Sequence, residues 1–329
     1  MKTILLTGCA GFIGANFLKT IAAFNKNYNF IILDALTYAG HYPTIENDIA
    51  TNSHFKFIKG DIRNREVVET IFKEVNISGV IHFAAESHVD NSIINPNIFV
   101  ETNVLGTLNL LNAALRLGES DIRFLHISTD EVYGQLKEAD PAFCETTPIA
   151  PSSPYSASKA ASDLLVRSYH ETYKMDVLIT RCSNNYGPYQ FPEKLIPLMI
   201  HNALNDKKLP VYGDGRNIRD WIYVDDHCEG IWQAFLKGRK GEVYNFGGNS
   251  EMRNIDVIKT ILKQVGKPES LISFVEDRKG HDWRYAINFN KAKKELQWQP
   301  KTLFSDGIKK TVHWYIENAS WINSVIKKQ

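Results

Sequence analysis

Short apolar runs alternate with longer segments of helical periodicity along the first half of the chain. The runs are rich in β-branched and aromatic residues, which predicts buried parallel strands. They lie at 3–7, 30–33, 55–62, 80–85, 124–128 and 177–181. Between several of them, apolar residues recur every three or four positions, as in 104–117 and 155–173. This alternation predicts an α/β fold built on a Rossmann-type doubly wound parallel sheet.

The sequence pattern changes after residue 180, where a turn-rich and aromatic segment occupies 184–192. We therefore place a domain boundary there, with residues 1–180 forming the Rossmann domain and 181–329 a smaller mixed α/β domain. Later segments are expected to return to the first domain. The expected helices of the second half are 194–205, 231–236, 255–265 and one about 304–326.

A glycine turn follows the first predicted strand and precedes a helix. Gly8, Gly11 and Gly14 have the spacing that lets a backbone approach a pyrophosphate at a helix N-terminus. Asp34 ends the second strand, 20 residues beyond Gly14, where a carboxylate accepts from ribose hydroxyls. Its charge would repel a 2′-phosphate, so NAD is favoured over NADP. The alternative is an aspartate that only caps the next turn.

A second group of chemically active residues follows the strand at 124–128. Thr129, Asp130 and Glu131 come at its carboxyl end, the edge where open α/β sheets bind ligands. Tyr155 and Lys159 lie four residues apart on one face of a predicted helix. A phenol beside an ammonium can transfer protons, although lowering its pKa to about 7 requires roughly 4 kcal/mol. The alternative is a surface tyrosine and a solvated lysine.

Four arginines of the second half stand in turn-like contexts rather than on a charged helix face. They are Arg216, Arg219, Arg278 and Arg284. Forked guanidinium groups suit bidentate recognition of phosphate, which favours a nucleotide diphosphate as ligand. Surface ion pairing is the alternative for each of them.

Overall charge and cysteine content narrow the function classes. The 329 residues include 38 Lys+Arg and 37 Asp+Glu, so a net charge of +1 draws the chain to neither nucleic acid nor anionic membrane. The four cysteines form no CxxC pair, which predicts reduced thiols in a cytoplasmic protein and no metal site. No stretch approaches the ~18 apolar residues of a membrane helix.

Two helices offer a surface for self-association. Apolar positions on 104–117 and 155–173 could pair with a second subunit and form a homodimer. The alternative is that both helices only cover the sheet.

Seven segments together resemble the dTDP-glucose 4,6-dehydratases, a branch of the extended short-chain dehydrogenase/reductases. They are GCAGFIG at 8–14, FAAESHVDNS at 83–92, STDEVYG at 128–134, YSASK at 155–159, NNYGPYQFPEKLIP at 184–197, RDWIYVDDH at 219–227 and DRKGHDWRYAI at 277–287. The glycine pattern and the Tyr-Lys pair mark only the superfamily, whereas Asp130-Glu131 after Thr129 is the narrow feature. Trp283 departs from the basic residue expected in the family's GHDRRY motif.

The resemblance implies two sets of binding residues. NAD would contact Gly8, Gly11, Phe12, Ile13, Gly14, Asp34, Ala35, Leu36, Thr37, Asp61, Ile62, Phe83, Ala84, Ala85, Ser87, Thr102, Tyr155, Lys159 and Asn185. The sugar nucleotide, dTDP-glucose, would contact Ser87, Thr129, Asn184, Lys194, Leu195, Pro210, Tyr212, Arg219, Asn254, Asp277, Arg278 and His281. The second half would thus be the sugar-nucleotide-binding domain.

The resemblance also implies an internal redox elimination. Tyr155 would deprotonate the C4 hydroxyl during oxidation at C4, with Lys159 lowering its pKa and Thr129 binding the C4 oxygen. Glu131 would take the C5 proton, and protonated Asp130 would donate to the departing C6 hydroxyl. Hydride return to C6 gives dTDP-4-keto-6-deoxyglucose, a step of rhamnose-type deoxysugar biosynthesis.

Three other functions use the same scaffold. The chain could be another NDP-sugar 4,6-dehydratase, a UDP-sugar 4-epimerase or a non-catalytic NAD-binding regulator. An epimerase has no use for an adjacent acid and base, and a regulator has no use for proton-transfer groups. Elimination is therefore the favoured prediction.

Overall fold

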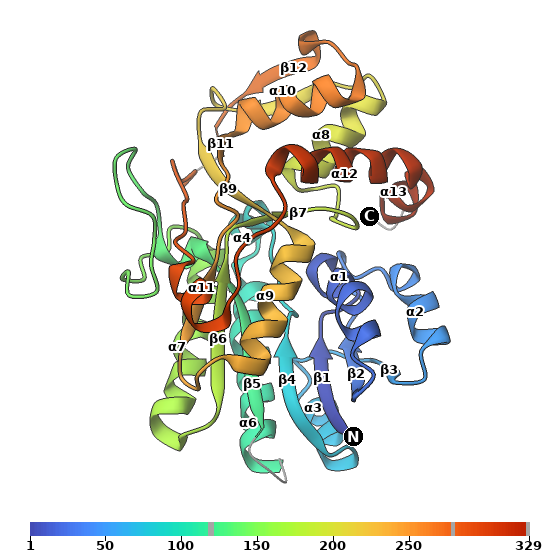
Figure 1. Ribbon diagram of the computed structural model, residues 1–329, viewed down its shortest axis with the longest axis vertical. Helices are drawn as coiled ribbons and strands as arrows, with labels where there is room; N and C mark the ends of the chain where they lie inside the picture. Colours follow the sequence, from blue (N-terminus) through green and yellow to red (C-terminus); the bar gives the residue numbers. More distant parts are fainter. Residues whose placement is uncertain (118–121, 278–279, 327–329) are drawn as a thin grey trace.

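A seven-stranded parallel sheet forms the centre of the molecule (Figure 1). The computed structural model describes residues 1–117, 122–277 and 280–326. The strand order is β10-β6-β5-β4-β1-β2-β3. The strands are β1 (Lys2–Thr7), β2 (Tyr28–Asp34), β3 (Phe55–Lys59), β4 (Ile77–His82), β5 (Arg123–Thr129), β6 (Val177–Cys182) and β10 (Val243–Phe246). The order reverses between β1 and β4, which creates a ligand crevice at the carboxyl ends. The predicted fold class is confirmed.

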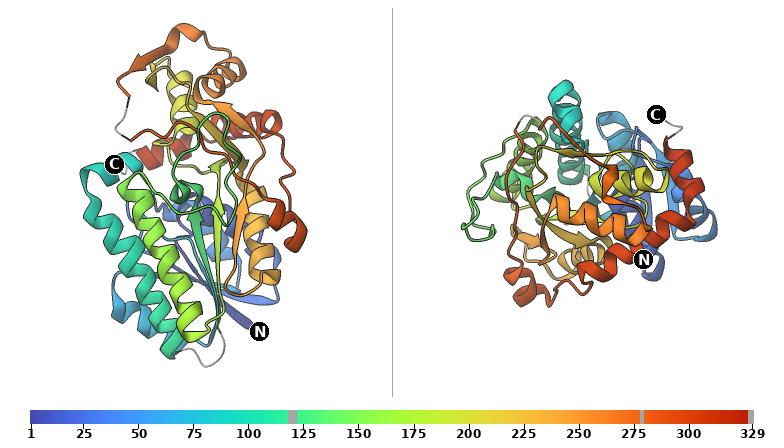
Figure 2. Two further views of the ribbon diagram at one scale, coloured as in Figure 1. Left: turned by 90° about the vertical axis from the view of Figure 1, so that its left-hand side faces the viewer. Right: turned by 90° about the horizontal axis from the view of Figure 1, so that it is seen from above.

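Helices cover both faces of the sheet, because successive strand residues point to opposite sides. In β1, Ile4 and Leu6 join one core and Leu5 the other. The first core is closed by α1 (Phe12–Thr20), α9 (Val224–Lys237) and α11 (Asn290–Leu296). The second is closed by α3 (Arg65–Glu74), α6 (Thr107–Leu117) and α7 (Pro154–Tyr173). Figure 2 shows α6 and α7 side by side on the outside of the molecule.

Segments from both halves of the chain build the large sheet. Strand β10 pairs in parallel with β6, and α9 packs against α1. The division at residue 180 therefore stays a prediction, with β10 and α9 joining the first half across it.

The smaller part of the molecule lies above the carboxyl ends of the large sheet in Figure 1. One three-stranded sheet contains β7 (Asn184–Tyr186), β9 (Ile218–Tyr223) and β11 (Glu251–Arg253), in which β11 runs antiparallel to β9. A two-stranded sheet pairs β8 (Leu209–Tyr212) with β12 (Ile272–Val275). The helices of this part are α8 (Leu195–Leu204), α10 (Asn254–Val265), α12 (Phe304–Glu317) and α13 (Ala319–Ile326).

Two expected helices are divided in the structure. The helix expected at 104–117 is a π-helix over Val100–Gly106 followed by α6. The final helix expected at 304–326 breaks at Asn318, which leaves helical geometry and whose side chain donates to the Trp314 carbonyl at 2.9 Å. Shorter elements are α2 (Glu46–Thr51), α4 (Val89–Ile94), α5 (Pro96–Phe99) and the turns Ala22–Phe24, Tyr42–Thr44, Asp130–Tyr133 and Glu269–Leu271.

One helical run differs from the expectation about membrane-spanning segments. Pro96–Arg116 is continuous and apolar enough to cross a membrane by length and composition, and 44% of that window is buried. In the structure this run packs against α7, and its Asn103 side chain is buried and hydrogen bonded. These contacts are those of a core helix.

Candidate active site

The glycine turn after β1 leaves room for a ligand at the N-terminus of α1. A Cβ on Gly8, whose φ is +77°, would lie 2.5 Å from the Ala84 nitrogen, and one on Gly14 would lie 2.6 Å from Cys9 Cα. Both glycines therefore allow the turn to fold onto its neighbours. A Cβ on Gly11 would meet only the Gly8 carbonyl, at 3.3 Å. The backbone amides of this turn can thus face an anionic group.

Asp34 is held at the end of β2 by the loops around it. One carboxylate oxygen accepts from the Ala10 nitrogen and the other from the Leu36 nitrogen, each at 2.8 Å. Leu36 adopts a φ of 56°, which turns the chain back over the carboxylate. Each oxygen has a further lone pair, so Asp34 can also accept from a diol.

A first cavity begins at this turn and extends across the carboxyl ends of the strands. It is lined by nearly every residue expected to contact the cofactor. These are Gly8, Gly11, Phe12, Ile13, Gly14, Asp34, Ala35, Thr37, Asp61, Ile62, Phe83, Ala84, Ala85, Ser87, Thr102, Tyr155, Lys159 and Asn185. Leu36 is the exception, since it contributes the backbone hydrogen bond to Asp34. The length and lining of the first cavity suit a dinucleotide.

The N-terminus of α7 places two of the proton-transfer residues on the first cavity. Ser153 caps this helix through a capping box with Ser156, and Pro154 occupies its first turn. Tyr155 and Lys159 then lie on one helix face and line the first cavity together with Thr129 and Glu131. The Lys159 Nζ donates to the Ile127 carbonyl at 2.7 Å.

The two adjacent carboxyl groups occupy different environments. Asp130 is 2% exposed, lines neither cavity, and lies 3.5 Å from the Thr129 hydroxyl through its Oδ1. Burial raises the pKa of Asp130 well above its usual value, and the carboxylates of Glu131 and Asp220 add to the rise. Its Oδ2 has no hydrogen-bond partner within the described part of the chain. These surroundings therefore favour the protonated form of Asp130.

The pKa of Tyr155 departs from the expectation. Burial raises it well above the usual value, Glu131 adds to the rise, and a hydrogen bond with Thr129 opposes it. Burial also lowers the pKa of Lys159 to about 8, against the attraction of Asp163. The protein's own groups thus favour the neutral phenol, and a cationic ring in the first cavity would be needed to favour the phenolate.

A second cavity adjoins the first and opens into the smaller part of the molecule. Expected substrate residues on it are Asn184, Lys194, Leu195, Pro210, Tyr212, Arg219, Asn254 and His281. Glu131, Asn184 and Lys194 line both cavities, so Glu131 stands where the two meet. Ser87 and Thr129 line the first cavity instead. A ligand in the second cavity can therefore reach the proton-transfer residues.

The four arginines of the second half have different surroundings. Arg219 lines the second cavity and lies over the Tyr285 ring, 4.3 Å from its centroid. Arg216 pairs with Asp214 at the surface, and Arg284 binds both oxygens of Glu251. Neither lines a cavity, which favours the alternative of ion pairing for these two. Arg278 lies outside the described residues.

Neither cavity is lined by Asp277, an expected substrate contact, or by Trp283, the departure from the family motif. Asp277 lines neither cavity and instead contacts the His281 Nδ1 at 2.6 Å, which orients that ring. Trp283 also lines neither cavity, and its backbone nitrogen donates to the Gln135 side-chain oxygen at 3.0 Å.

Comparison with known proteins places this site in a family. The family model for GDP-mannose 4,6 dehydratase matches residues 5–311. A dTDP-glucose 4,6-dehydratase of Xanthomonas campestris pv. campestris is 52% identical over 342 residues, covering 99% of this chain and 96% of that protein. The chain belongs to the dTDP-glucose 4,6-dehydratase family. The resemblance inferred from the motifs is thereby confirmed.

Solved structures of dTDP-glucose 4,6-dehydratases have the same fold. The Bacillus anthracis enzyme in complex with NAD has a TM-score of 0.91 and 46% identity, covering 99% of this chain and all of that one. The Streptomyces venezuelae enzyme, crystallised with NAD and a second ligand, has a TM-score of 0.93 and 44% identity, covering 98% and 99% of the two chains.

The structure adds residues to the dehydratase site that the motifs did not single out. Glu193 lines both cavities and accepts from the Tyr38 hydroxyl at 3.1 Å, and His88 lies 3.7 Å from it. Lys194 donates to the Ser87 carbonyl at 2.6 Å. Its place in the NNYGPYQFPEKLIP motif at 184–197 could have drawn attention to Glu193. Within the described residues, no cluster of His, Cys, Asp and Glu could hold a metal ion.

Proposed function

We propose that this chain is a dTDP-glucose 4,6-dehydratase, which converts dTDP-glucose to dTDP-4-keto-6-deoxyglucose and water. The carboxyl pair at the end of β5 supports elimination over epimerisation. Asp130 is buried, which raises its pKa and favours its protonated form, whereas its neighbour Glu131 lines both cavities. Elimination of water requires a base at C5 and an acid at the C6 hydroxyl, in addition to the base at the C4 hydroxyl that 4-epimerisation also uses.

The first cavity fits NAD for two reasons. Gly8 and Gly14 keep the turn after β1 free of side chains, and the Asp34 carboxylate can accept hydrogen bonds from ribose hydroxyls. The turn amides would hold the pyrophosphate, Asp34 the adenosine ribose, and Asp61 the adenine side. When bound, NAD would supply reversible hydride transfer, in which the hydride that C4 of the sugar loses is returned to C6.

Tyr155, Lys159 and Thr129 act on the C4 hydroxyl. Tyr155 takes its proton as general base, and the charged Lys159 stabilises the phenolate that this requires. Thr129 hydrogen-bonds the C4 oxygen and thereby orients the hydroxyl toward Tyr155. All three line the first cavity, which supports a shared role.

Asp130 and Glu131 then remove water between C5 and C6. The C4 ketone acidifies the C5 proton, which Glu131 takes, while Asp130 gives its proton to the C6 hydroxyl so that it departs as water. Glu131 afterwards returns a proton to C5. Arg219 binds the diphosphate, and the side of the second cavity with Tyr212, Asn254 and His281 receives the nucleotide.

An assay with a set of sugar nucleotides tests this proposal. The purified chain is incubated with dTDP-glucose, UDP-glucose, GDP-mannose and dTDP-galactose, and the products are separated by chromatography against standards of each epimer and then examined by mass spectrometry. We expect loss of one water from dTDP-glucose and much slower turnover of the others. Conversion of UDP-glucose to an isomer of equal mass would support a 4-epimerase, and loss of water from GDP-mannose alone would support a different dehydratase.

We further propose a homodimer formed through α6 and α7. These neighbouring helices lie on the outside of the molecule (Figure 2). Together with the π-helix before α6 they expose apolar side chains. Val100 and Leu105 are each 49% exposed, and Leu164 is 54% exposed. Burial of such side chains against a second copy would stabilise a dimer by about 25 cal/mol per Å² of apolar surface.

Light scattering during size-exclusion chromatography tests the dimer. We expect twice the chain mass of 37.4 kDa for the wild type and a single chain mass for the double variant Leu105→Glu, Leu164→Glu. Leu236→Glu is the matched control, since Leu236 is exposed on α9 at the other face of the sheet. A monomeric wild type would overturn the proposal.

The location proposed for this enzyme is the cytoplasm. Cys9, Cys144, Cys182 and Cys228 are all free thiols, which suits a reducing compartment.

A further inference from the structure

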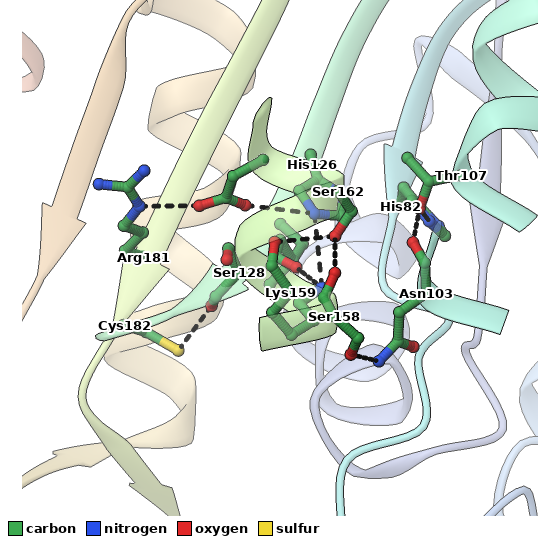
Figure 3. A network of polar contacts seen from close by, with 12 residues as sticks. His82, Asn103, Thr107, His126, Ser128, Ser158, Lys159, Ser162, Arg181 and Cys182 are labelled. Atoms are coloured by element: carbon green, nitrogen blue, oxygen red, sulfur yellow. Dashed lines mark hydrogen bonds and ion pairs between the residues drawn. The ribbon is translucent and has the colours of Figure 1, made fainter. Parts of the chain in front are cut away.

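A buried cluster of charged and polar side chains lies behind the catalytic lysine (Figure 3). Lys159 and Asp163 come from α7, one turn apart, while His126 comes from β5 and Arg181 from β6. Each of the four is at most 4% exposed. Charges this deep in a protein persist only when they are paired, so the partners of Lys159 determine whether it stays charged.

His126 connects the lysine and the aspartate. Its Nε2 lies 3.4 Å from the Lys159 Nζ and 3.5 Å from the Asp163 Oδ1. The second oxygen of Asp163 accepts from the Arg181 Nε at 2.9 Å. The carboxylate therefore binds one cation, Arg181, directly and faces the second, Lys159, across the His126 ring, since its Oδ1 has no hydrogen-bond partner among the described residues.

The remaining groups around Lys159 supply no second anion. His82 on β4 and His126 on β5 are both kept neutral, because burial lowers the pKa of each imidazole. Burial raises the pKa of the Cys182 thiol on β6 and of the Tyr155 phenol on α7, so these are neutral as well. Among the described residues that face Lys159, Asp163 is thus the charged counterpart.

We propose that Asp163 is a positioning residue that holds the Lys159 ammonium charged at the active site across His126, and that Arg181 limits this effect by binding the same carboxylate. The inference rests on the proposed function only for its consequence in catalysis. The charge of Lys159 is what stabilises the Tyr155 phenolate, so Asp163 would act on the first proton transfer without touching the sugar.

The two partners of the carboxylate can be removed separately, with opposite expected effects. Asp163→Asn keeps the shape and a hydrogen bond to Arg181 but removes the anion, so the Lys159 pKa should fall by about one unit or more. Arg181→Gln removes the competing cation and should raise the Lys159 pKa. Asp176→Asn is the matched control, because Asp176 pairs with Arg123 at 2.9 Å at the opposite end of β5. It should leave the Lys159 pKa unchanged.

The measurement is an NMR titration of full-length protein labelled with lysine carrying 13C at Cε, with its NAD content matched between variants. The Lys159 signal is assigned by its absence in Lys159→Arg. The titration reports the protonation of Lys159 directly and involves no turnover. A chain that is inactive on dTDP-glucose would therefore still show the expected shifts of the Lys159 pKa. Failure of the proposed function and failure of this inference are therefore distinguishable.

Turnover adds a second measurement. The high-pH decline of kcat should move to lower pH in Asp163→Asn and to higher pH in Arg181→Gln, whereas general loss of packing would reduce kcat at every pH. An unchanged Lys159 pKa in Asp163→Asn, or shifts of the same sign in both variants, would overturn the proposal. If Asp163→Asn does not fold, the Arg181→Gln titration decides, since only a rise agrees with a shared carboxylate.

Discussion

Glu131 lines both cavities of the active site, while the adjacent Asp130 is buried and lines neither. The two carboxyl groups differ in solvation although they are one residue apart, because β5 ends at Thr129 and the chain enters a tight turn. Desolvation favours the protonated form of Asp130. Neighbouring side chains can therefore serve as acid and base at one pH.

Replacement of this pair should separate oxidation at C4 from loss of water. In Asp130→Asn and in Glu131→Gln we expect formation of the 4-keto-6-deoxy product to fall by about 10²–10⁴, the usual contribution of a general acid or base. Oxidation at C4 should persist, because Tyr155 and Lys159 are unchanged. Rapid-quench mass spectrometry of the sugar nucleotide measures the two steps separately.

Glu138→Gln is the control for this pair, since Glu138 is an exposed carboxylate in the loop that follows. It should retain wild-type rates. Water loss at the wild-type rate in both Asp130→Asn and Glu131→Gln would contradict the assigned roles.

Tyr155→Phe should stop the reaction before any ketone forms. The variant keeps the ring, which is 6.3 Å from Phe99 by centroid, and loses only the phenolic oxygen that is proposed to accept the proton of the C4 hydroxyl. We expect kcat to fall by about 10²–10⁴ with the affinity for dTDP-glucose little changed. Tyr173→Phe alters an exposed tyrosine of the same helix and should be neutral. Isothermal titration calorimetry and steady-state kinetics together check this, and a comparable kcat in Tyr155→Phe would refute the role.

Local patterns were sufficient to predict the parts of the site that follow strand ends. The Gly8 turn follows β1, and Asp34 and Thr129 are the last residues of β2 and β5. Parallel strands bring their carboxyl ends to one edge. The pairing of Tyr155 with Lys159 follows from helical spacing in the same way. The family motifs supplied most of the remaining lining residues.

Contacts between distant segments could not be predicted from the sequence. Arg219 and Arg284 have similar local contexts, yet only Arg219 reaches a cavity, because Glu251 from another strand binds Arg284. The Tyr38 contact to Glu193 spans 155 residues. Burial of Asp130 likewise depends on the tertiary packing around the end of β5. These features depend on which segments meet in three dimensions.

Gly8 should be far less tolerant of a side chain than another glycine of similar conformation. Gly8 and Gly266 have φ of +77° and +67°, but a Cβ on Gly8 would overlap the Ala84 backbone, whereas one on Gly266 meets nothing within 4 Å. Gly266→Ala should therefore lower the free energy of unfolding by only about 1 kcal/mol, which is the cost of placing a residue with a Cβ in the left-handed conformation. Gly8→Ala should cost about 3 kcal/mol or more and weaken NAD binding. Urea unfolding measures both, and equal costs would argue against the close approach of the turn.

The pH dependence of catalysis and that of stability should run in opposite directions because of Lys159. Burial lowers its pKa in the folded chain to about 8, whereas an unfolded lysine titrates near about 10.4. The charged form needed beside Tyr155 declines as pH rises through 8, so kcat should fall there.

Between pH 8 and about 10 the unfolded chain binds more protons at this residue than the folded chain does. Linkage then makes the contribution of Lys159 to the free energy of unfolding rise with pH across that window. Lys159→Met removes the group, so the stability of the wild type relative to this variant should increase from pH 8 to 10 while wild-type kcat decreases. Urea unfolding of both proteins at unit pH intervals provides the check. A relative stability that stays constant with pH, together with a kcat that keeps rising to pH 10, would mean that Lys159 titrates as an ordinary solvated amine.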